Sequence, residues 1–251
     1  HSQALVYGVP KDALLQPKVV TKKVFESLSD TKNVITRSKD HFEWPSSAGI
    51  MMFDYDPEDE ALDKEAVLQL LYKACPEIKN VDHLWWTSSS SNISNSETGE
   101  KLSGVAGQRV YVMIQEAIDI PRAAKVIADR LWLADLGNFK ISISGSMLER
   151  VPFDMSVYQP SRLDFASGAF TKSPLIQKRG LPCLIKGTNK VLDTKTTLPD
   201  LDEEKKALLD VNKRGRRSIS MIEAGKAKAE FVHQQTKRIV AIDPTLLPDD
   251  V

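Results

Sequence analysis

Two aspartates, Asp54 and Asp56, follow the apolar run of residues 50–53 with one residue between them. A short apolar run of this kind predicts a buried strand, and alternate side chains of a strand point to the same face. Two carboxylates on one face suit Mg²⁺, which prefers hard oxygen ligands and completes its shell with water and substrate phosphates. Two such ions together support phosphoryl displacement. The alternative is that these acids only cap a turn or solubilise a strand edge.

Three later segments follow this one in order along the chain. They are a serine-rich strand end at 87–91, the strand Gly-Gln-Arg-Val-Tyr-Val at 107–112, and an acid at 154 that precedes Pro-Ser-Arg-Leu-Asp-Phe at 160–165. With Phe-Asp-Tyr-Asp at 53–56, these segments resemble the archaeo-eukaryotic primase superfamily, in particular the primase-polymerases of plasmids and phages. The resemblance runs from about residue 35 to about residue 180 and agrees in order and approximate spacing.

The resemblance implies a template-directed nucleotidyltransferase, a DNA primase, a DNA polymerase or both, that acts in the replication of a plasmid, phage or other mobile element. Asp54 and Asp56 match the first metal-binding motif, and Asp154 matches the acid that completes the metal site. These three residues are therefore expected to be catalytic and to bind Mg²⁺ or Mn²⁺. The expected partners are a single-stranded DNA template and nucleoside triphosphates, with a helicase domain fused or associated.

Arg109 stands where the family has a histidine that contacts the phosphates of the incoming nucleotide. Arginine keeps a cation with a rigid fork for phosphate oxygens, so nucleotide binding is expected to survive the change. The alternative is a surface strand residue paired with an acid such as Glu116. A second hypothesis for the whole chain is a catalytically degenerate primase-fold module that binds DNA or a replication partner. The three acids favour the enzyme, because close carboxylates are costly without a cation.

Four further residues are candidates for binding the nucleotide. Ser88 and Ser90 match the hydroxyl positions of the middle motif, and the alternative for them is a flexible linker. Arg150 and Arg162 flank the third acid and are expected to bind phosphate or to set the charge state of that acid. Their alternative partners are Glu149 and Asp164.

Strands and helices interleave without the glycine fingerprint of a dinucleotide-binding fold. This order predicts the α/β (α+β) class, with a mixed, partly antiparallel sheet and flanking helices, and the resemblance implies the RRM-like core of primase-polymerases. The aromatic side chains Trp85, Trp86 and Tyr111 are expected to lie in the core rather than to form platforms for bases. The expected strands are 33–36, 49–56, 81–87, 108–114 and 139–144, and the expected helices are 61–74 and 119–137.

The predicted domain organisation has three parts. Residues 1–185 form the catalytic domain, and 186–201, rich in Thr, Lys, Asp and Pro with weak periodicity, form a linker. Residues 202–251 form a small C-terminal helical unit, in which the helix is interrupted at Gly215 or at both Gly215 and Gly225. The basic run 213–217 is expected either to contact phosphate or to be a solvated helix face.

Composition and missing motifs exclude several classes of protein. Thirty-four basic and thirty-four acidic residues give no net charge, so any nucleic-acid-binding surface must be local. Two isolated cysteines exclude a zinc cluster and predict a reducing, cytoplasmic location, and no apolar run predicts membrane insertion or export. The sequence lacks His-x-His, His-Glu-x-x-His and the phosphate-binding Gly-x-x-x-x-Gly-Lys-Ser/Thr, and no Ser or Cys triad can be assembled.

Overall fold

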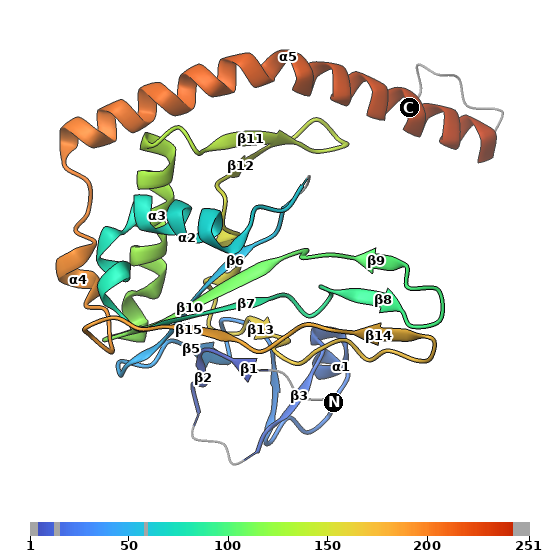
Figure 1. Ribbon diagram of the computed structural model, residues 1–251. Coiled ribbons are helices and arrows are strands. Elements are labelled where there is room, and N and C mark those ends of the chain that lie inside the picture. Colours follow the sequence, from blue (N-terminus) through green and yellow to red (C-terminus); the bar gives the residue numbers. More distant parts are fainter. Residues whose placement is uncertain (1–4, 13–15, 58–59, 243–251) are drawn as a thin grey trace. The chain divides into compact units, whose positions relative to one another are not determined.

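The computed structural model describes residues 5–12, 16–57 and 60–242, and the chain forms two compact units. Unit 1 comprises residues 1–127 and 152–200, and unit 2 comprises residues 128–151 and 201–251. Both helices and strands are present, as Figure 1 shows, and the expectation of a mixed α/β fold with flanking helices and a helical C-terminal unit is confirmed.

The centre of unit 1 is a four-stranded antiparallel sheet. β10 lies between β7 and β6, and β15 pairs with the outer side of β7. The strands are β15 (Cys183–Ile185), β7 (His83–Thr87), β10 (Gln108–Ile114) and β6 (Gly49–Tyr55). The three longer strands lie where the sequence predicted them, because each is an apolar run rich in β-branched and aromatic residues.

One face of this sheet carries the core. Met51 and Phe53 of β6 and Val110 and Val112 of β10 are fully buried. α2 (Lys64–Ala74) and the first part of α3 (Ile120–Leu133) contribute buried side chains to the same core. α2 begins after its N-cap Asp63, whose carboxylate accepts a 2.7 Å hydrogen bond from the amide of residue 66, and it ends before a proline, as predicted. Besides the first part of α3, the described residues of unit 1 form the helices α1 (Lys22–Glu26), α2 (Lys64–Ala74) and α4 (Thr194–Thr197) and the 3₁₀ turns η1 (Pro76–Asn80), η2 (Ala117–Asp119) and η3 (Met155–Val157).

Short sheets surround the central one. β1 (Leu5–Val6) pairs with β13 (Leu163–Asp164), β2 (Val9–Pro10) with β5 (Phe42–Glu43), and β3 (Lys18–Val20) runs parallel to β4 (Val34–Thr36). A three-stranded sheet contains β14 (Leu175–Gln177), β8 (Ile93–Asn95) and β9 (Lys101–Ser103). The pairing of β1 with β13 matters most for the site, because it joins the N-terminal segment to residue 164.

The segment 186–200 is part of unit 1 rather than the free linker predicted from its composition. Residues 81 and 114 form parallel bridges with residues 189 and 192, and Leu192 and Leu198 are buried. A Cβ atom on Gly187 would lie 2.4 Å from the carbonyl carbon of Asn80, so this stretch packs directly on unit 1. The weak periodicity of 186–201 gave no indication that Leu192 and Leu198 are buried in the core.

Unit 2 is a hairpin, β11 (Asn138–Ile141) and β12 (Met147–Arg150), packed against α5 (Glu203–Ile242). The boundary between the units falls inside α3 (Ile120–Leu133), so residues 128–151 group with the C-terminal helix and not with the catalytic domain predicted to end at 185. α5 is continuous for 40 residues, so the predicted interruption at Gly215 and Gly225 is wrong. Residues 243–251 of the expected C-terminal unit lie outside the described residues.

Two residues of the basic run 213–217 pair with acids of unit 2. Lys213 Nζ lies 2.7 Å from Glu149, and Arg216 lies 3.5 Å from Asp135. These pairs favour the structural alternative for this part of the run. None of the helices in the described part of the chain combines the length and the apolar character needed to cross a membrane.

Candidate functional site

Asp54 and Arg109 lie directly opposite one another on the paired strands β6 and β10. Opposite residues of an antiparallel pair project from the same face with Cβ atoms roughly 5 Å apart. The Nε atom of Arg109 lies 3.3 Å from Oδ1 of Asp54. The strand register therefore brings together the first acid of the predicted metal site and the arginine predicted to bind phosphate.

The pKa of Asp54 is affected by both other predicted acids, Asp154 and Asp56. Burial raises the pKa of Asp54, and the guanidinium of Arg109 lowers it, but the net shift is upward. The charges of Asp154 and Asp56 raise the pKa of Asp54 further, so both of these carboxylates lie within electrostatic range of Asp54. Asp56, just beyond β6, is exposed and has no hydrogen-bond or ion-pair partner in the described part of the chain.

A backbone hydrogen bond places Asp154 beside the end of β6. The amide of Asp154 donates to the carbonyl of Asp54 at 2.8 Å, which joins residues that are far apart in the sequence. The Asp154 carboxylate caps η3: Oδ1 accepts from the amide of Ser156 at 2.8 Å, and Oδ2 accepts from its hydroxyl at 2.7 Å. Arg162 reaches within 3.9 Å of Asp154. The partner of Arg162 is therefore the third acid, and not Glu149 or Asp164.

The donor chemistry of these acids fits Mg²⁺ or Mn²⁺, since three carboxylates offer hard oxygen ligands. Their side chains do not form a preformed metal-binding site, because among the described residues no group of three or more His, Cys, Asp or Glu side chains is placed to hold an ion. Arg109 contacts Oδ1 of Asp54, and Ser156 contacts both oxygens of Asp154. To bind a metal ion here, Asp54 and Asp154 would have to give up these hydrogen bonds and coordinate the ion instead.

Asp164 is a central residue of the site that the sequence did not single out. Its side chain is fully buried, and it accepts hydrogen bonds from Nη1 of Arg109, from the hydroxyl of Tyr111 at 3.0 Å and from the hydroxyl of Tyr7 at 2.6 Å. Burial and the Asp164 charge raise the pKa of both tyrosines, so they stay neutral donors. Nothing in a single sequence links residues 7 and 164, because β1 and β13 meet only in the folded chain.

Arg109 consequently bridges two acids. Burial alone would lower the pKa of Arg109, but Asp54 and Asp164 outweigh burial and raise it. The alternative partner Glu116 is wrong, because Glu116 pairs with Lys195 at 2.7 Å. Arg109 is a mostly buried cation at the centre of the site, and not a surface strand residue.

The two predicted serines have different surroundings. The Ser88 hydroxyl is buried and lies 3.2 Å from that of Ser90 and 3.1 Å from that of Ser91. Ser91 in turn donates to the carbonyl of Gly107 at 3.4 Å and accepts from the amide of residue 106 at 3.1 Å. The loop is therefore closed by its own hydrogen bonds, and only Ser90 is exposed to a ligand.

Arg150, the remaining candidate, lies at the end of β12 in unit 2. It is exposed, and its Nη1 donates to the carbonyl of Glu149 at 3.2 Å. The other candidate residues for binding metal or nucleotide belong to unit 1.

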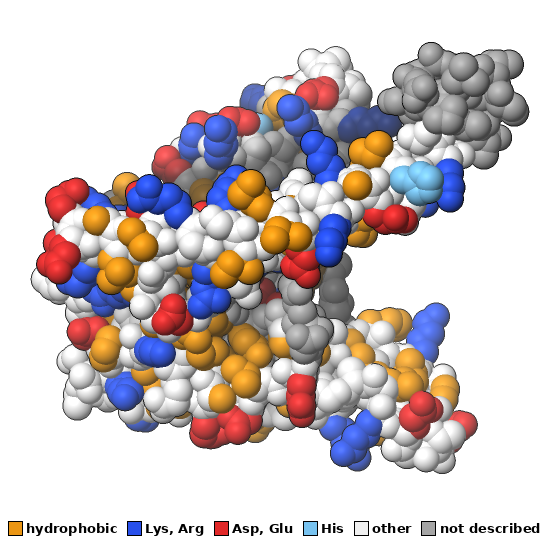
Figure 2. Space-filling model, turned by 90° about the horizontal axis from the view of Figure 1, so that it is seen from above, with side chains coloured by type: hydrophobic (Ala, Val, Ile, Leu, Met, Phe, Trp, Pro, Cys, Tyr) orange, Lys and Arg blue, Asp and Glu red, His pale blue; other side chains and the backbone are white. Residues whose placement is uncertain are grey.

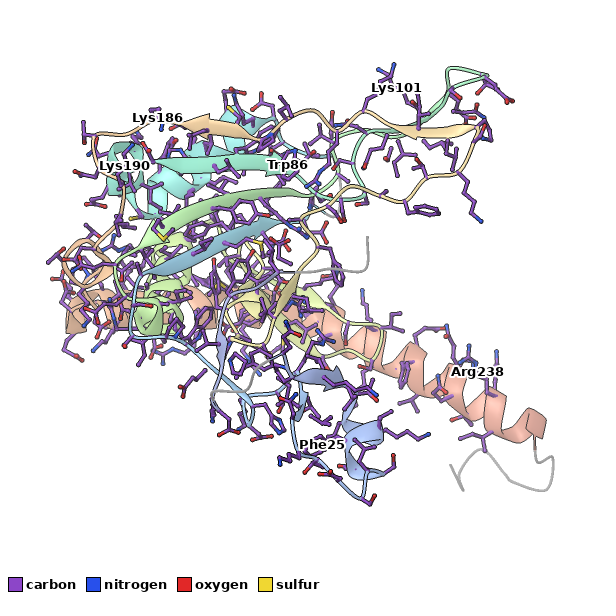
Figure 3. All side chains as sticks on the ribbon, turned by 90° about the horizontal axis from the view of Figure 1, so that it is seen from below. Phe25, Trp86, Lys101, Lys186, Lys190 and Arg238 are labelled. Carbon is purple, nitrogen blue, oxygen red and sulfur yellow. The ribbon has the colours of Figure 1, made fainter. Side chains whose placement is uncertain are left out.

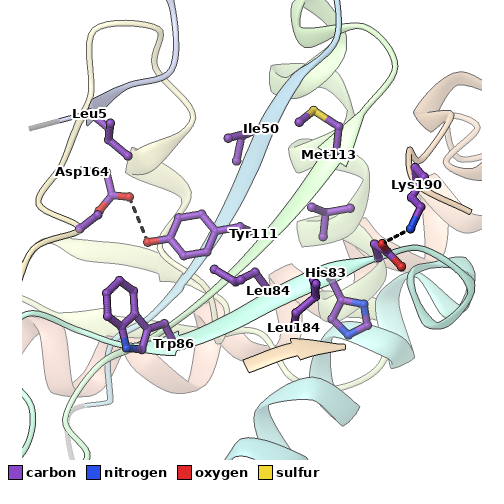
Figure 4. A pocket seen from close by; sticks show the side chains of 13 residues that line it. Leu5, Ile50, His83, Leu84, Trp86, Tyr111, Met113, Asp164, Leu184 and Lys190 are labelled. Carbon is purple, nitrogen blue, oxygen red and sulfur yellow. Dashed lines mark hydrogen bonds and ion pairs between the residues drawn. The ribbon is translucent and has the colours of Figure 1, made fainter. Parts of the chain in front are cut away.

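An apolar pocket of about 350 Å³ lies on the face of the central sheet that carries Tyr111. Figure 4 shows Trp86, Leu84 and Tyr111 around it, with the hydroxyl of Tyr111 directed at Asp164. Trp86 lies opposite Arg109 in the strand register, and the guanidinium of Arg179 lies 3.7 Å from the centre of the Trp86 ring. Trp86 and Tyr111 are only half-buried, so placing both in the core was wrong.

Leu5 of β1 and Asp164 of β13 line one end of the pocket, and Lys190 lines the other end (Figure 4). Lys186 and Lys190, which Figure 3 shows together beside β15 and β7, both pair with Asp82, at 3.2 and 2.7 Å. The pocket is therefore apolar at its floor and charged at its rim.

Comparison with protein-family models, with curated proteins and with solved structures finds no match to this chain.

Proposed function

We propose that this chain is a template-directed nucleotidyltransferase, a DNA primase or DNA polymerase acting in the replication of a plasmid, phage or mobile element. The observation that carries the proposal is the 2.8 Å hydrogen bond from the amide of Asp154 to the carbonyl of Asp54. It brings two acids from separate motifs to the end of one buried strand, with Asp56 beside them. This proximity of Asp54 and Asp154 supports the shared metal site that the resemblance to primase-polymerases implies.

Asp54, Asp56 and Asp154 would hold Mg²⁺ or Mn²⁺ through their carboxylate oxygens. Two bound divalent ions supply activation of a hydroxyl and stabilisation of the leaving oxygens in a phosphoryl displacement. Nε of Arg109 donates a hydrogen bond to Asp54, so release from that acid would free Nε to bind the triphosphate. Its bond to Asp164 would keep the guanidinium in place during this exchange.

The apolar pocket supports a nucleic-acid partner. Trp86 and Tyr111 line it, and aromatic side chains stack on bases without regard to sequence. The expected partners are thus a single-stranded DNA template and nucleoside triphosphates, with a helicase domain fused or associated. A reaction that consumes nucleoside triphosphates also favours a cytoplasmic location.

A second function is a catalytically degenerate module that binds DNA or a replication partner. The specific observation in its favour is that Arg109 neutralises Asp54 and Asp164 within the chain itself. A cation supplied by the protein removes the electrostatic need for a metal ion. The same residues then form a structural ion-pair network.

Primer synthesis and primer extension on single-stranded DNA, with Mg²⁺ or Mn²⁺ and labelled nucleotides, separate the two functions. We expect metal-dependent products from the wild-type chain and none above background from Asp54→Ala or Asp154→Ala. Asp40→Ala is the matched control, because Asp40 is an exposed acid outside the site. A folded wild-type chain that binds DNA but makes no product with either metal supports the degenerate module.

A further inference from the structure

The outward face of α5 carries an apolar stripe that the described residues leave open. Leu208, Val211, Ile219 and Ile222 are 51, 58, 77 and 70% exposed. Figure 2 shows hydrophobic side chains at intervals along this helix, between Lys and Arg. At roughly 100° per residue, these positions and Gly215 fall within a sector of about 80°. One side of a long helix is thus apolar and without a partner.

The other side of α5 is already occupied. Leu209 and Ala224 are buried within unit 2, where α5 packs on β11 and β12. These two residues lie on the side of the helix away from the stripe. The stripe is therefore additional to the packing that holds unit 2 together.

The spacing of the stripe is symmetric. From 208 to 211, 215, 219 and 222 the intervals are 3, 4, 4 and 3, the same in both directions about Gly215. An interface between two identical chains related by a two-fold axis must be self-complementary in this way. With two copies antiparallel, Leu208 would face Ile222 of the second copy, and Val211 would face Ile219 of the second copy. Intervals of three and four are also those of a helix–helix seam.

Gly215 at the centre has no explanation within one chain. A glycine in a helix interior costs about 1 kcal/mol relative to alanine. A Cβ atom at Gly215 would meet no atom of the described residues within 4 Å, so no contact in that part of the chain requires a glycine there. On a two-fold axis, a residue without a side chain lets the two helix backbones approach closely.

Charges at the ends of the stripe select the antiparallel direction. Glu204 and Lys226 are each eleven residues from Gly215, and both are exposed. Neither has an ion-pair partner among the residues that the structure describes. An antiparallel pair places Glu204 against Lys226 of the second copy at both ends. A parallel pair would place like charges together, which is unfavourable.

From these observations we propose that α5 forms an antiparallel dimer of this chain, centred on Gly215. The inference is independent of the proposed enzymatic function, because it uses only residues of α5.

Analytical ultracentrifugation of the full chain across a concentration series tests the dimer. The wild-type chain is expected to associate, and Ile222→Glu is expected to weaken association at least about tenfold, because it buries a carboxylate against Leu208 of the second copy. Met221→Glu is the matched control, since Met221 is a neighbouring exposed residue outside the stripe, and it should change association little. A wild-type monomer throughout the series, or a dimer unaffected by Ile222→Glu, overturns the proposal.

Charge exchange tests the direction. Glu204→Lys and Lys226→Glu should each weaken association, because each creates two like-charge pairs. The double variant should restore it, because the pairs are re-formed with the signs exchanged. Failure of the double variant to recover contradicts the antiparallel register.

Crosslinking tests the centre. Gly215→Cys should form a disulfide between two copies on mild oxidation. Arg217→Cys, exposed but about 160° around the helix, should not. The wild-type chain under the same oxidant controls for Cys75 and Cys183, which are free thiols. Equal crosslinking at 215 and 217 would count against the proposal.

Discussion

Arg109 of β10 donates through Nη1 to the carboxylate of Asp164, a side chain with no exposed surface. The same arginine reaches Asp54 through Nε at 3.3 Å. One mostly buried cation therefore pairs with two acids, and Asp164 also accepts hydrogen bonds from two tyrosines, Tyr7 and Tyr111, that stay neutral. This network joins the predicted catalytic strand to the N-terminal segment of the chain.

Removal of Arg109 is expected to destabilise the fold as well as the site. Arg109→Ala leaves Asp164 buried without a counter-charge, which costs about 3–5 kcal/mol of the free energy of unfolding. Urea denaturation of the variant and the wild-type chain measures this loss. Arg162→Ala is the control, since Arg162 is largely exposed and only 3.9 Å from Asp154, and it should cost less than about 1 kcal/mol. Equal losses would show that the buried network carries no special stability.

Replacing Ser88 and replacing Ser90 should have different effects on stability and on activity. Ser88→Ala removes a buried hydroxyl that bonds to Ser90 and Ser91, so unfolding free energy should fall by about 1 kcal/mol. Ser90→Ala alters an exposed hydroxyl and should change stability by less than about 0.5 kcal/mol. If the proposed nucleotide contact is made by Ser90, its variant raises the KM for nucleotide with a normal thermal midpoint. A loss of stability in Ser90→Ala would contradict this division.

The strands that carry the site were predictable because their patterns are strong. The apolar run before Asp54 and the β-rich run around Arg109 each specify one strand, and the structure has β6 and β10 there. Gly215 alone predicts a break in the helix, but α5 continues through it. The lysines and arginines around Gly215 are good helix formers, and together they offset the cost of one glycine.

The site was predictable only in part, for reasons of topology. The apolar run before Asp54 indicated that Asp54 lies at the exit of a buried strand, and the resemblance indicated Asp154. Asp164 and Tyr7 could not be connected, because their contact depends on the pairing of β1 with β13 across most of unit 1. The alternative that paired Arg109 with Glu116 is wrong, because charge spacing along the sequence carries no information on strand register.

The segment after residue 185 should behave as part of the core of unit 1. Gly187→Ala would place a methyl group against the backbone of Asn80, and we expect a loss of about 1–3 kcal/mol. Leu192→Ala removes a buried side chain and should cost about 2–5 kcal/mol. Gly104→Ala is the matched glycine control, since its Cβ would meet nothing within 4 Å. Thermal unfolding of the three variants measures these effects, and unchanged stability in the first two would restore the interpretation of 186–201 as a linker.

Asp119 gives unit 1 a pH-dependent contribution to stability. Its carboxylate accepts hydrogen bonds from Nε and Nη2 of Arg122, at 2.6 and 2.7 Å, and from the hydroxyl of Thr194. Burial raises the pKa of Asp119, but these hydrogen bonds outweigh burial and lower it.

Because the folded pKa of Asp119 lies below the unfolded value of about 3.9, the stabilisation is complete above that pH and is lost as the pH falls through the folded pKa. Asp119→Asn should therefore reduce the free energy of unfolding by about 2 kcal/mol at neutral pH. The difference from the wild-type chain should shrink below about pH 4. Urea denaturation across the acidic range measures it. Asp200→Asn is the control, because Asp200 contacts the same arginine at 3.0 Å but is 70% exposed, and it should change stability by less than about 1 kcal/mol. A difference for Asp119→Asn that stays constant down to acid pH would show that the ionised carboxylate is not what stabilises the fold.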